Sequence, residues 1–247
     1  EDDFFQNIML FTNGLALDKD LINKIMSPKI EFLINLNNPN KIGKEKYEKT
    51  CQNIQYLSNY FRAHNLPIRA RLGINIDKKD FDYKYIIDKT LEFGFNAIRY
   101  SIIVPNTTGE QISLDYYKKF IPQIINFLND CHKNNIMTSI DCNNIPKCLF
   151  TKDDLINMSL CNQDLVIKNH CGMPLDVDID LNCTRCFPFF ESNSINLRDF
   201  NNIEEIMRYF HYTIDRHRFN IPTFKECVDC QYFKENKCQG ACLTYKF

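Results

Sequence analysis

The residues best suited to chemistry in this sequence are four cysteines close to its C-terminal end. Cys227, Cys230, Cys238 and Cys242 follow the spacing C-x2-C-x7-C-x3-C, with Gly240 between the last two. A two-residue gap lets both sulfurs of a C-x2-C pair point to one metal, and thiolates suit zinc as well as iron-sulfur clusters. The spacing therefore predicts a metal site and leaves the two metals as alternatives.

A second pair of cysteines lies further upstream. Cys171 and Cys186 are separated by fourteen residues. Zinc ribbons usually combine two C-x2-C pairs, whereas here the last C-terminal pair is C-x3-C with an internal glycine. This departure favours iron-sulfur clusters over zinc.

The composition supports metal binding and argues against several other classes of protein. The chain has 247 residues, 44% of them hydrophobic, and a formal net charge of -1, as expected of one large globular domain or a domain with an appendage. The balanced charge predicts no nucleic-acid partner and no membrane partner. The apolar runs are too short to span a bilayer, and the first residues do not resemble a signal peptide, so we expect a cytoplasmic protein. In the reducing cytoplasm, twelve cysteines indicate metal binding rather than disulfides.

Short β-rich runs alternate with helical stretches in the first part of the chain, which predicts βα units around a parallel sheet. We expect strands over Ile8–Thr12, Ile30–Asn35, Ile68–Ile76, Ala97–Val104 and Ile136–Ile140, and helices over Asp18–Met26, Glu45–His64, Asp80–Phe93 and Ser113–Lys133. A complete eightfold barrel needs roughly 250 residues. The prediction is an α/β fold, with a partial (βα) barrel of parallel strands over residues 1–145 and a cysteine-rich α+β domain over residues 146–247.

Three local features refine these elements. Pro122 should kink the helix predicted over Ser113–Lys133 or delay its start, because proline cannot donate a helical hydrogen bond. Further on, "DVDIDLN" (Asp176–Asn182) alternates acidic with apolar residues and is predicted to be a strand. A last helix is expected near Ile203–Arg218.

Polar residues follow several of the predicted strands, at the ends where ligands bind in folds of this class. Asn13 follows the first strand, Asn35 ends the second and Asn75 lies near the end of the third. For each of them a simple turn-forming role is the alternative. Arg71 and Arg99, on the third and fourth strands, could bind a carboxylate or form an ion pair at the edge of the sheet.

These features occur in an order that resembles a known family. "LFTNG" on a strand, the run of βα units, and C-x14-C followed by C-x2-C-x7-C-x3-C make the whole chain similar to the C-terminal two-thirds of radical S-adenosylmethionine enzymes with a SPASM-type auxiliary-cluster domain. The resemblance implies a barrel that binds S-adenosylmethionine and a C-terminal region that holds one or two further 4Fe-4S clusters. It implies that Asn13, Asn35, Arg71 and Asn75 bind the cofactor.

The sequence also departs from the pattern of this family. The catalytic C-x3-C-x2-C spacing does not occur in the chain. The gap before Cys238 is seven residues instead of five, the glycine expected shortly before the second upstream cysteine is lacking, and the last cysteine of the family would fall beyond Phe247. We therefore expect a chain truncated at its N-terminus, with truncation at the C-terminus as a further alternative, and one incomplete cluster.

The resemblance also implies two sets of metal ligands. One cluster would use Cys171, Cys186 and Cys242, with Cys161 as the fourth ligand and Cys148 as the alternative. The other would use Cys227, Cys230 and Cys238, with a missing residue or a non-cysteine group at the fourth position. Cys183 is expected to be structural, and Cys51 and Cys131 to be ordinary buried thiols.

Two functions follow from this reading of the sequence. The resemblance implies an enzyme that modifies a peptide or protein substrate by hydrogen abstraction, with an electron donor protein as a further partner. The alternative is a non-catalytic module that binds zinc or an iron-sulfur cluster and serves in protein interactions. The metal that the protein binds would separate the two.

Overall fold

A computed structural model of the chain describes residues 7–102, 113–140, 145–161 and 174–246. The chain divides into two compact units whose segments alternate along the sequence. The first unit takes its residues from 1–103, 120–141 and 152–166, and the second from 104–119, 142–151 and 167–247. A residue's position along the chain therefore does not by itself say to which unit it belongs.

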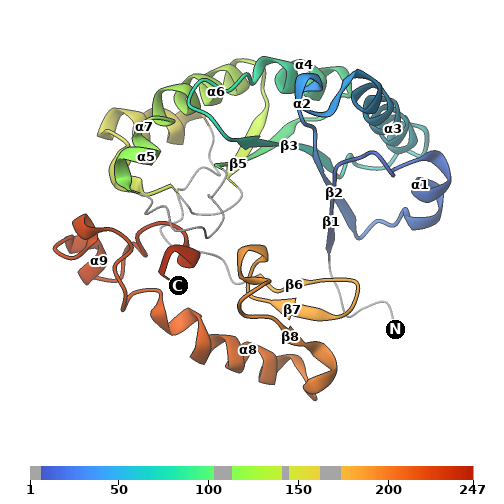
Figure 1. Cartoon of the computed structure of the whole chain (residues 1–247). Helices are drawn as coiled ribbons and strands as arrows, with labels where there is room; N and C mark the ends of the chain where they lie inside the picture. Colours follow the sequence, from blue (N-terminus) through green and yellow to red (C-terminus); the bar gives the residue numbers. More distant parts are fainter. Residues whose placement is uncertain (1–6, 103–112, 141–144, 162–173, 247) are drawn as a thin grey trace. The chain divides into compact units, whose positions relative to one another are not determined.

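The first unit is built on a sheet of five parallel strands (Figure 1). The strands lie in sequence order, and each pairs in parallel with the next. They are β1 (Ile8–Thr12), β2 (Ile30–Asn35), β3 (Ala70–Ile76), β4 (Ala97–Ile102) and β5 (Met137–Ile140). Parallel strands in sequence order, joined by helices, are the arrangement of a (βα) barrel wall, so the predicted α/β fold with a partial barrel is confirmed.

Helices join the strands and cover one face of the sheet (Figure 1). They are α1 (Lys19–Ile25), α2 (Pro39–Ile42), α3 (Lys44–Ala63), α4 (Lys84–Glu92) and α6 (Ile121–Lys133), followed by α7 (Lys152–Cys161). The ring of Phe32 on β2 contacts Phe61 of α3 at 6.4 Å between centroids, and Tyr100 on β4 contacts Phe127 of α6 at 5.7 Å. These rings belong to the buried core, and every second residue of each strand shares their side of the sheet.

The alternate residues of each strand point to the opposite side of the sheet from the buried rings, and we call this side the inner face. Strand pairing places these residues side by side across the sheet, for example Gly73 beside Arg99 and Asn75 beside Ser101. The inner face carries Met9, Phe11, Glu31, Leu33, Asn35, Arg71, Gly73, Asn75, Ala97, Arg99, Ser101, Met137 and Ser139.

The helix predicted over residues 113–133 is divided into two. Helix α5 (Leu114–Lys118) ends at its C-cap residue Lys119, and α6 begins at Ile121 with Pro122 in its first turn. Proline is tolerated there because the first amides of a helix have no partner within the helix. Pro122 therefore delays the start of the helix, which is one of the two expected outcomes.

The second unit has a small antiparallel sheet with the strand order β6-β7-β8 and several short helices. After α5 its elements are η1 (Lys147–Leu149), β6 (Asp176–Val177), β7 (Asn182–Thr184), η2 (Phe187–Phe189), β8 (Ile195–Asn196), η3 (Leu197–Asp199), α8 (Ile203–Thr213), η4 (Asp215–His217), η5 (Lys225–Cys227), α9 (Gln231–Lys234) and η6 (Leu243–Lys246), where η marks a 3-10 helix. Its core gathers Cys183, Phe189, Ile206, Phe210, Ile214 and Leu243. The predicted last helix thus ends at Thr213, and a 3-10 turn continues it.

Residues 176–182 form most of a β-hairpin, and the prediction of one continuous strand there was wrong. The side chain of Asp178 accepts hydrogen bonds from the amides of Asp180 and Asn182, at 2.9 Å and 2.8 Å, and Leu181 has a φ of 65°. Strands β6 and β7 then pair antiparallel on either side of this turn. An aspartate that bonds the backbone amides after it favours a turn over an extended strand, which explains the difference.

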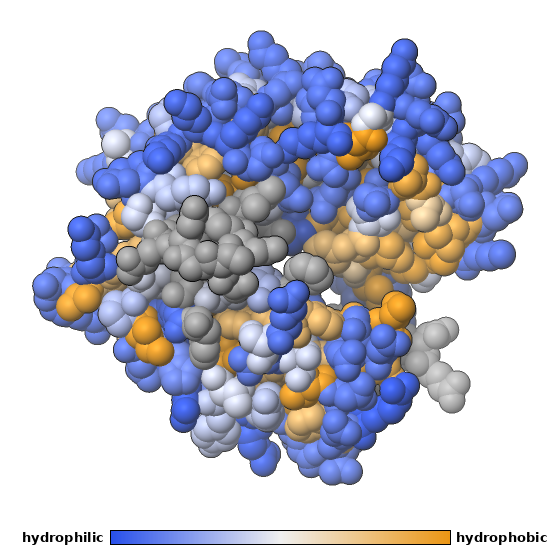
Figure 2. Space-filling model, in the orientation of Figure 1, coloured by the Kyte–Doolittle hydropathy of each residue, from blue (hydrophilic) through white to orange (hydrophobic). Residues whose placement is uncertain are grey.

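The surface of the first unit includes exposed apolar side chains on β1 and α1. They are Ile8, Met9, Phe11 and Leu21, in a region that Figure 2 shows as hydrophobic. Within the described ranges, none of the helices combines the length and the apolar character that crossing a membrane requires. Among these apolar residues, Phe11 lies on the inner face of β1, where the side chain of Arg99 contacts its ring.

Candidate cofactor-binding face and cysteine site

The inner face of the sheet carries many polar side chains among apolar ones. Its half-buried side chains include Glu31, Asn35, Arg71, Asn75 and Ser101. Strands of parallel sheets that are buried on both faces are apolar throughout, so this much polarity on one face needs an explanation. A polar ligand on this face would provide one.

Two separate polar contacts lie toward the C-terminal ends of β2, β3 and β4. The side chain of Asn35 lies over Gly73, since a Cβ atom on that glycine would be only 2.4 Å from the Asn35 Oδ1. Two residues further along β3, the Oδ1 of Asn75 accepts a hydrogen bond of 2.9 Å from the Ser101 hydroxyl. Amides both donate and accept hydrogen bonds, so these side chains can hold a polar ligand at the end of the sheet where ligands bind in such folds.

Asn13 has a local role in the turn after β1. Its Oδ1 accepts a hydrogen bond of 3.0 Å from the Leu15 amide. The side-chain amide of Asn53 on α3 donates to the carbonyls of Gly14 and Leu15, each at 3.0 Å. The structure thus gives Asn13 the turn-forming role that the sequence left open, and cofactor binding by Asn13 stays a prediction.

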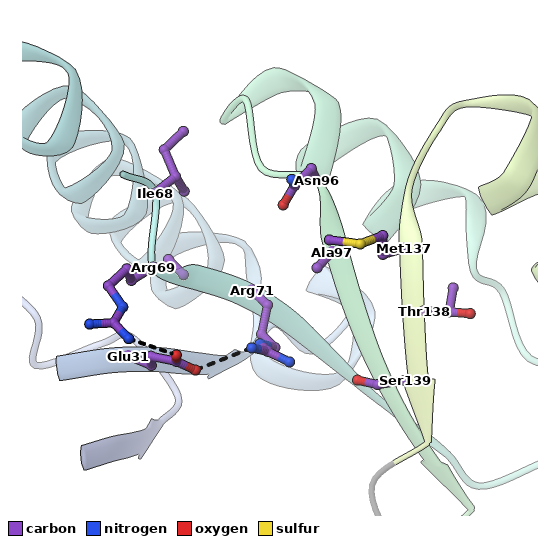
Figure 3. A pocket seen from close by; sticks show the side chains of 10 residues that line it. Glu31, Ile68, Arg69, Arg71, Asn96, Ala97, Met137, Thr138 and Ser139 are labelled. Carbon is purple, nitrogen blue, oxygen red and sulfur yellow. Dashed lines mark hydrogen bonds and ion pairs between the residues drawn. The ribbon is translucent and has the colours of Figure 1, made fainter. Parts of the chain in front are cut away.

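Arg71 lies near the opposite end of β3, in a pocket of about 380 Å³ at the start of the strands (Figure 3). Both Arg69 and Arg71 form ion pairs with Glu31, at 3.1 Å and 3.2 Å. Four residues of extended strand separate Arg71 from Asn75, which is roughly 13 Å. Asn35 pairs with Gly73, midway along β3 between Arg71 and Asn75, and the part of all three side chains in cofactor binding stays a prediction.

The C-terminal cysteines are held by short turns of the second unit. Cys227 ends η5, and Cys230 is the N-cap residue of α9. Gly240, with a φ of 76°, donates its amide to the Cys238 Sγ at 3.4 Å, and a Cβ atom on this glycine would lie 3.1 Å from the Cys227 Sγ. The backbone of Gly240 thus lies beside two thiols, and N–H donation to sulfur is a contact that tunes thiolate ligands.

Cys148 belongs to the same unit and lies near these thiols. Burial and the charges of Cys238, Cys227 and Cys230 raise the pKa of Cys148 to about 11. Burial also raises the pKa of Cys227, and the thiols of Cys238 and Cys230 add to this effect. The four sulfurs are therefore electrostatic neighbours, although Cys148 lies far upstream in the sequence.

The other expected ligand set is described only in part. Cys186 packs against the core cluster that contains Leu243, the residue after Cys242. The Cys242 Sγ is buried and lies 2.9 Å from the Thr244 hydroxyl. Cys171 lies outside the described residues, as does the side chain of Cys161 at the end of α7. Metal binding by this set stays a prediction.

The remaining cysteines lie in helices or in a core. Cys51 is on α3 and Cys131 is fully buried on α6. Burial raises the pKa of both thiols. Cys183 is completely buried in the core of the second unit. Among the residues that the structure describes, no three or more histidine, cysteine, aspartate or glutamate side chains are arranged to hold a metal ion.

Comparison with known proteins gives a structural match only. No protein-family model matches the sequence, and no curated protein matches it. Two crystal structures of SuiB from Streptococcus suis, one of them bound to S-adenosylmethionine, match the chain with a TM-score of 0.58 at 12% identity. The fold resembles that of SuiB. The match covers 95% of this chain and 55% of the SuiB chain, so the present chain spans about half the length of SuiB.

Sequence reasoning missed Gly73 and Ser101, and it linked Cys148 to the other cysteine set. Gly73 interrupts a strand pattern, which is a signal for close approach of another group. Ser101 is a polar residue within the apolar run "AIRYSIIV". Cys148 carries no sequence signal that links it to Cys227, because only the folded chain brings the two together.

Proposed function

We propose that this chain is the cofactor-binding and auxiliary-cluster part of a radical S-adenosylmethionine enzyme. The observation that carries the proposal is the likeness, over 95% of the chain, to a protein solved with S-adenosylmethionine bound. The cysteine array and the strand-end residues, from which the sequence resembles this family, support it independently of the structural match.

On this proposal the inner face binds S-adenosylmethionine at the C-terminal ends of the strands. Asn35, Asn75 and Ser101 offer hydrogen-bond donors and acceptors there. When bound and reduced by one electron from the electron donor, the cofactor would supply a radical for hydrogen abstraction, and the protein would orient the reacting atoms. We propose a peptide or protein as the substrate and an electron donor protein as the partner.

The cysteine-rich unit would hold the auxiliary 4Fe-4S clusters. Cys227, Cys230 and Cys238 have the thiol chemistry that a cluster needs and are electrostatic neighbours, and the Gly240 amide donates to the Cys238 sulfur. The side chains must still converge on the metal, which rotation about χ1 allows.

Cofactor binding can be tested without turnover. We expect the chain to bind S-adenosylmethionine in equilibrium dialysis, and Asn35→Ala and Asn75→Ala each to weaken binding about tenfold, the loss of one good hydrogen bond. Asn59→Ala, on the exposed side of α3, is the matched control and should leave binding unchanged. If all three variants bind S-adenosylmethionine with equal affinity, the inner face is not the cofactor site.

Metal content and cleavage test the rest of the proposal. Anaerobically reconstituted protein should contain iron and acid-labile sulfide. Because these 247 residues contain no C-x3-C-x2-C spacing, they should not form 5'-deoxyadenosine from S-adenosylmethionine with dithionite. Zinc alone, with no sulfide, would favour the non-catalytic interaction module instead.

A further inference from the structure

We propose that Cys148 is the fourth ligand of a four-thiolate metal site with Cys227, Cys230 and Cys238. That the metal is an iron-sulfur cluster rests on the proposed function, whereas the ligand set rests on the fold of the second unit. The family resemblance offered Cys148 only as an alternative ligand for the other set. It left the fourth position of this set to a missing residue or a non-cysteine group.

A chain of contacts places Cys148 beside the C-terminal cysteines. Cys148 is the middle residue of η1, which packs against α5. From α5, the buried ring of Tyr117 meets Phe224 edge to face, with 6.2 Å between centroids. Phe224 is the N-cap residue of η5, whose last residue is Cys227. Two buried aromatic rings therefore fix the turn that carries Cys148 relative to the turn that carries Cys227.

The thiols of this set are electrostatic neighbours, and cations lie close to them. Cys148 interacts with Cys238, Cys227 and Cys230, as the causes of its raised pKa show. Lys118 on α5 interacts with the Cys148 thiol, and Lys246 interacts with the Cys227 thiol. Four thiolates around a metal leave a net negative charge, which two neighbouring lysines would offset.

Cys148 is also the cysteine best able to fill the fourth position. Structural zinc sites and 4Fe-4S clusters take four protein ligands, and the C-terminal turns supply three. Of the other described cysteines in this unit, Cys183 is buried in the core and Cys186 packs against that core, while Cys242 is buried with its Sγ 2.9 Å from the Thr244 hydroxyl. Cys148 keeps more of its surface exposed, so its side chain can turn toward the other three without disturbing the core.

Thiol protection in the unmodified chain provides the test. Anaerobic protein is titrated with Co²⁺, treated with N-ethylmaleimide, and each cysteine is followed by mass spectrometry with and without metal. We expect Co²⁺ to protect Cys148 together with Cys227, Cys230 and Cys238, while Cys51 reacts equally in both samples. Unchanged alkylation of Cys148 while the other three become protected would overturn the proposal.

Variants give a second readout. Cys148→Ser should lower the sulfur-to-cobalt charge-transfer absorbance by roughly a quarter, as expected when one of four thiolate ligands is lost. Cys51→Ser is the matched control and should leave the spectrum unchanged. A Cys148→Ser spectrum identical to that of the parent protein would also overturn the ligand assignment. Iron and sulfide content after reconstitution tests the proposed function separately, because zinc on the same four thiols would contradict that function and leave the ligand set intact.

Discussion

The guanidinium of Arg99 on β4 lies over the ring of Phe11 on β1, with its central carbon 4.8 Å from the ring centroid. Strands β2 and β3 separate these two residues. Three strand spacings in a flat sheet would place them about 14 Å apart. Their contact requires the sheet to curve toward its inner face, as the wall of a barrel does.

This contact should contribute measurably to stability. We expect Phe11→Leu and Arg99→Met to show a coupling energy of about 0.5–1 kcal/mol in a double-mutant cycle, the range for a partly exposed cation–π pair. Urea unfolding of the parent, the two single variants and the double variant gives this energy. Strictly additive effects would mean that the curvature of the sheet does not depend on this pair.

Gly73 should be sensitive to a single methyl group. In Gly73→Ala the new Cβ would meet the Asn35 Oδ1 at 2.4 Å, so the Asn35 side chain must move. We expect a loss of stability of about 1–3 kcal/mol, as for overpacked sites, and weaker binding of S-adenosylmethionine. The matched test is the same substitution in an Asn35→Ala background, where the loss of stability should be much smaller. An equal loss in both backgrounds would place the strain elsewhere.

The ion pair between Arg185 and Asp215 should hold the second unit together. The two side chains are 2.9 Å apart and each is only 4% exposed. Asp215→Asn would leave the arginine buried without its counter-charge, which typically costs 3–5 kcal/mol. Asp229→Asn, at the exposed ion pair with Lys234, is the control and should cost less than about 1 kcal/mol. Denaturant unfolding of the two variants makes the comparison, and similar losses would contradict it.

Cys186 and Cys242 are expected to share a cluster. Cys242→Ser and Cys186→Ser should each remove one cluster's worth of iron and make the second unit more sensitive to protease. A metal that joins these residues restricts the unfolded chain, and for a loop of this length the effect on stability is about 4 kcal/mol.

Iron per chain, combined with limited proteolysis, gives the answer. Cys51→Ala and Cys131→Ala serve as controls and should keep the iron. If Cys242→Ser retains full iron and protease resistance, the C-terminal cysteines form a self-contained site without Cys186.

One hydrogen bond predicts a pH-dependent stability. The Tyr83 hydroxyl donates to Asp130 at 2.8 Å, and together with Lys133 it lowers the pKa of that carboxyl. A carboxyl whose pKa is lower in the folded state stabilises the fold at neutral pH, and this contribution is lost as the pH falls through the lowered pKa. Tyr83→Phe should therefore lower the free energy of unfolding by only about 1 kcal/mol at neutral pH, because Asp130 is partly exposed. The loss should be smaller in acid, where Asp130 is protonated in both proteins.

Urea unfolding of the parent and Tyr83→Phe across the acid range tests this. Lys89→Met, at a partly exposed ion pair with Glu92 on α4, is the control, and its stability difference from the parent should narrow less in acid. A constant difference between Tyr83→Phe and the parent at every pH would rule out Asp130 as the titrating partner.

The local sequence determined the elements of the first unit because their signals are short-range. The apolar run of β2 predicted a strand, and Phe32, Leu33 and Ile34 within it are all buried. Both β1 and β2 have the bounds predicted for them, and Pro122 delays α6 through its missing N–H. At residues 176–182, alternation predicted a strand, but the hydrogen bonds of Asp178 made a hairpin instead.

The sites depend on contacts that no local pattern contains. The spacing of Cys227, Cys230, Cys238 and Cys242 predicts a metal site, because a few residues of chain are enough to bring these thiols together. The closeness of Cys148 follows only from the packing of α5 and Phe224, which overcomes the entropy of closing a long loop. In the same way, strand pairing allows Glu31 to form an ion pair with Arg71 and places the Asn35 side chain over Gly73. The sequence determined which groups are present, and the tertiary structure decided which of them meet.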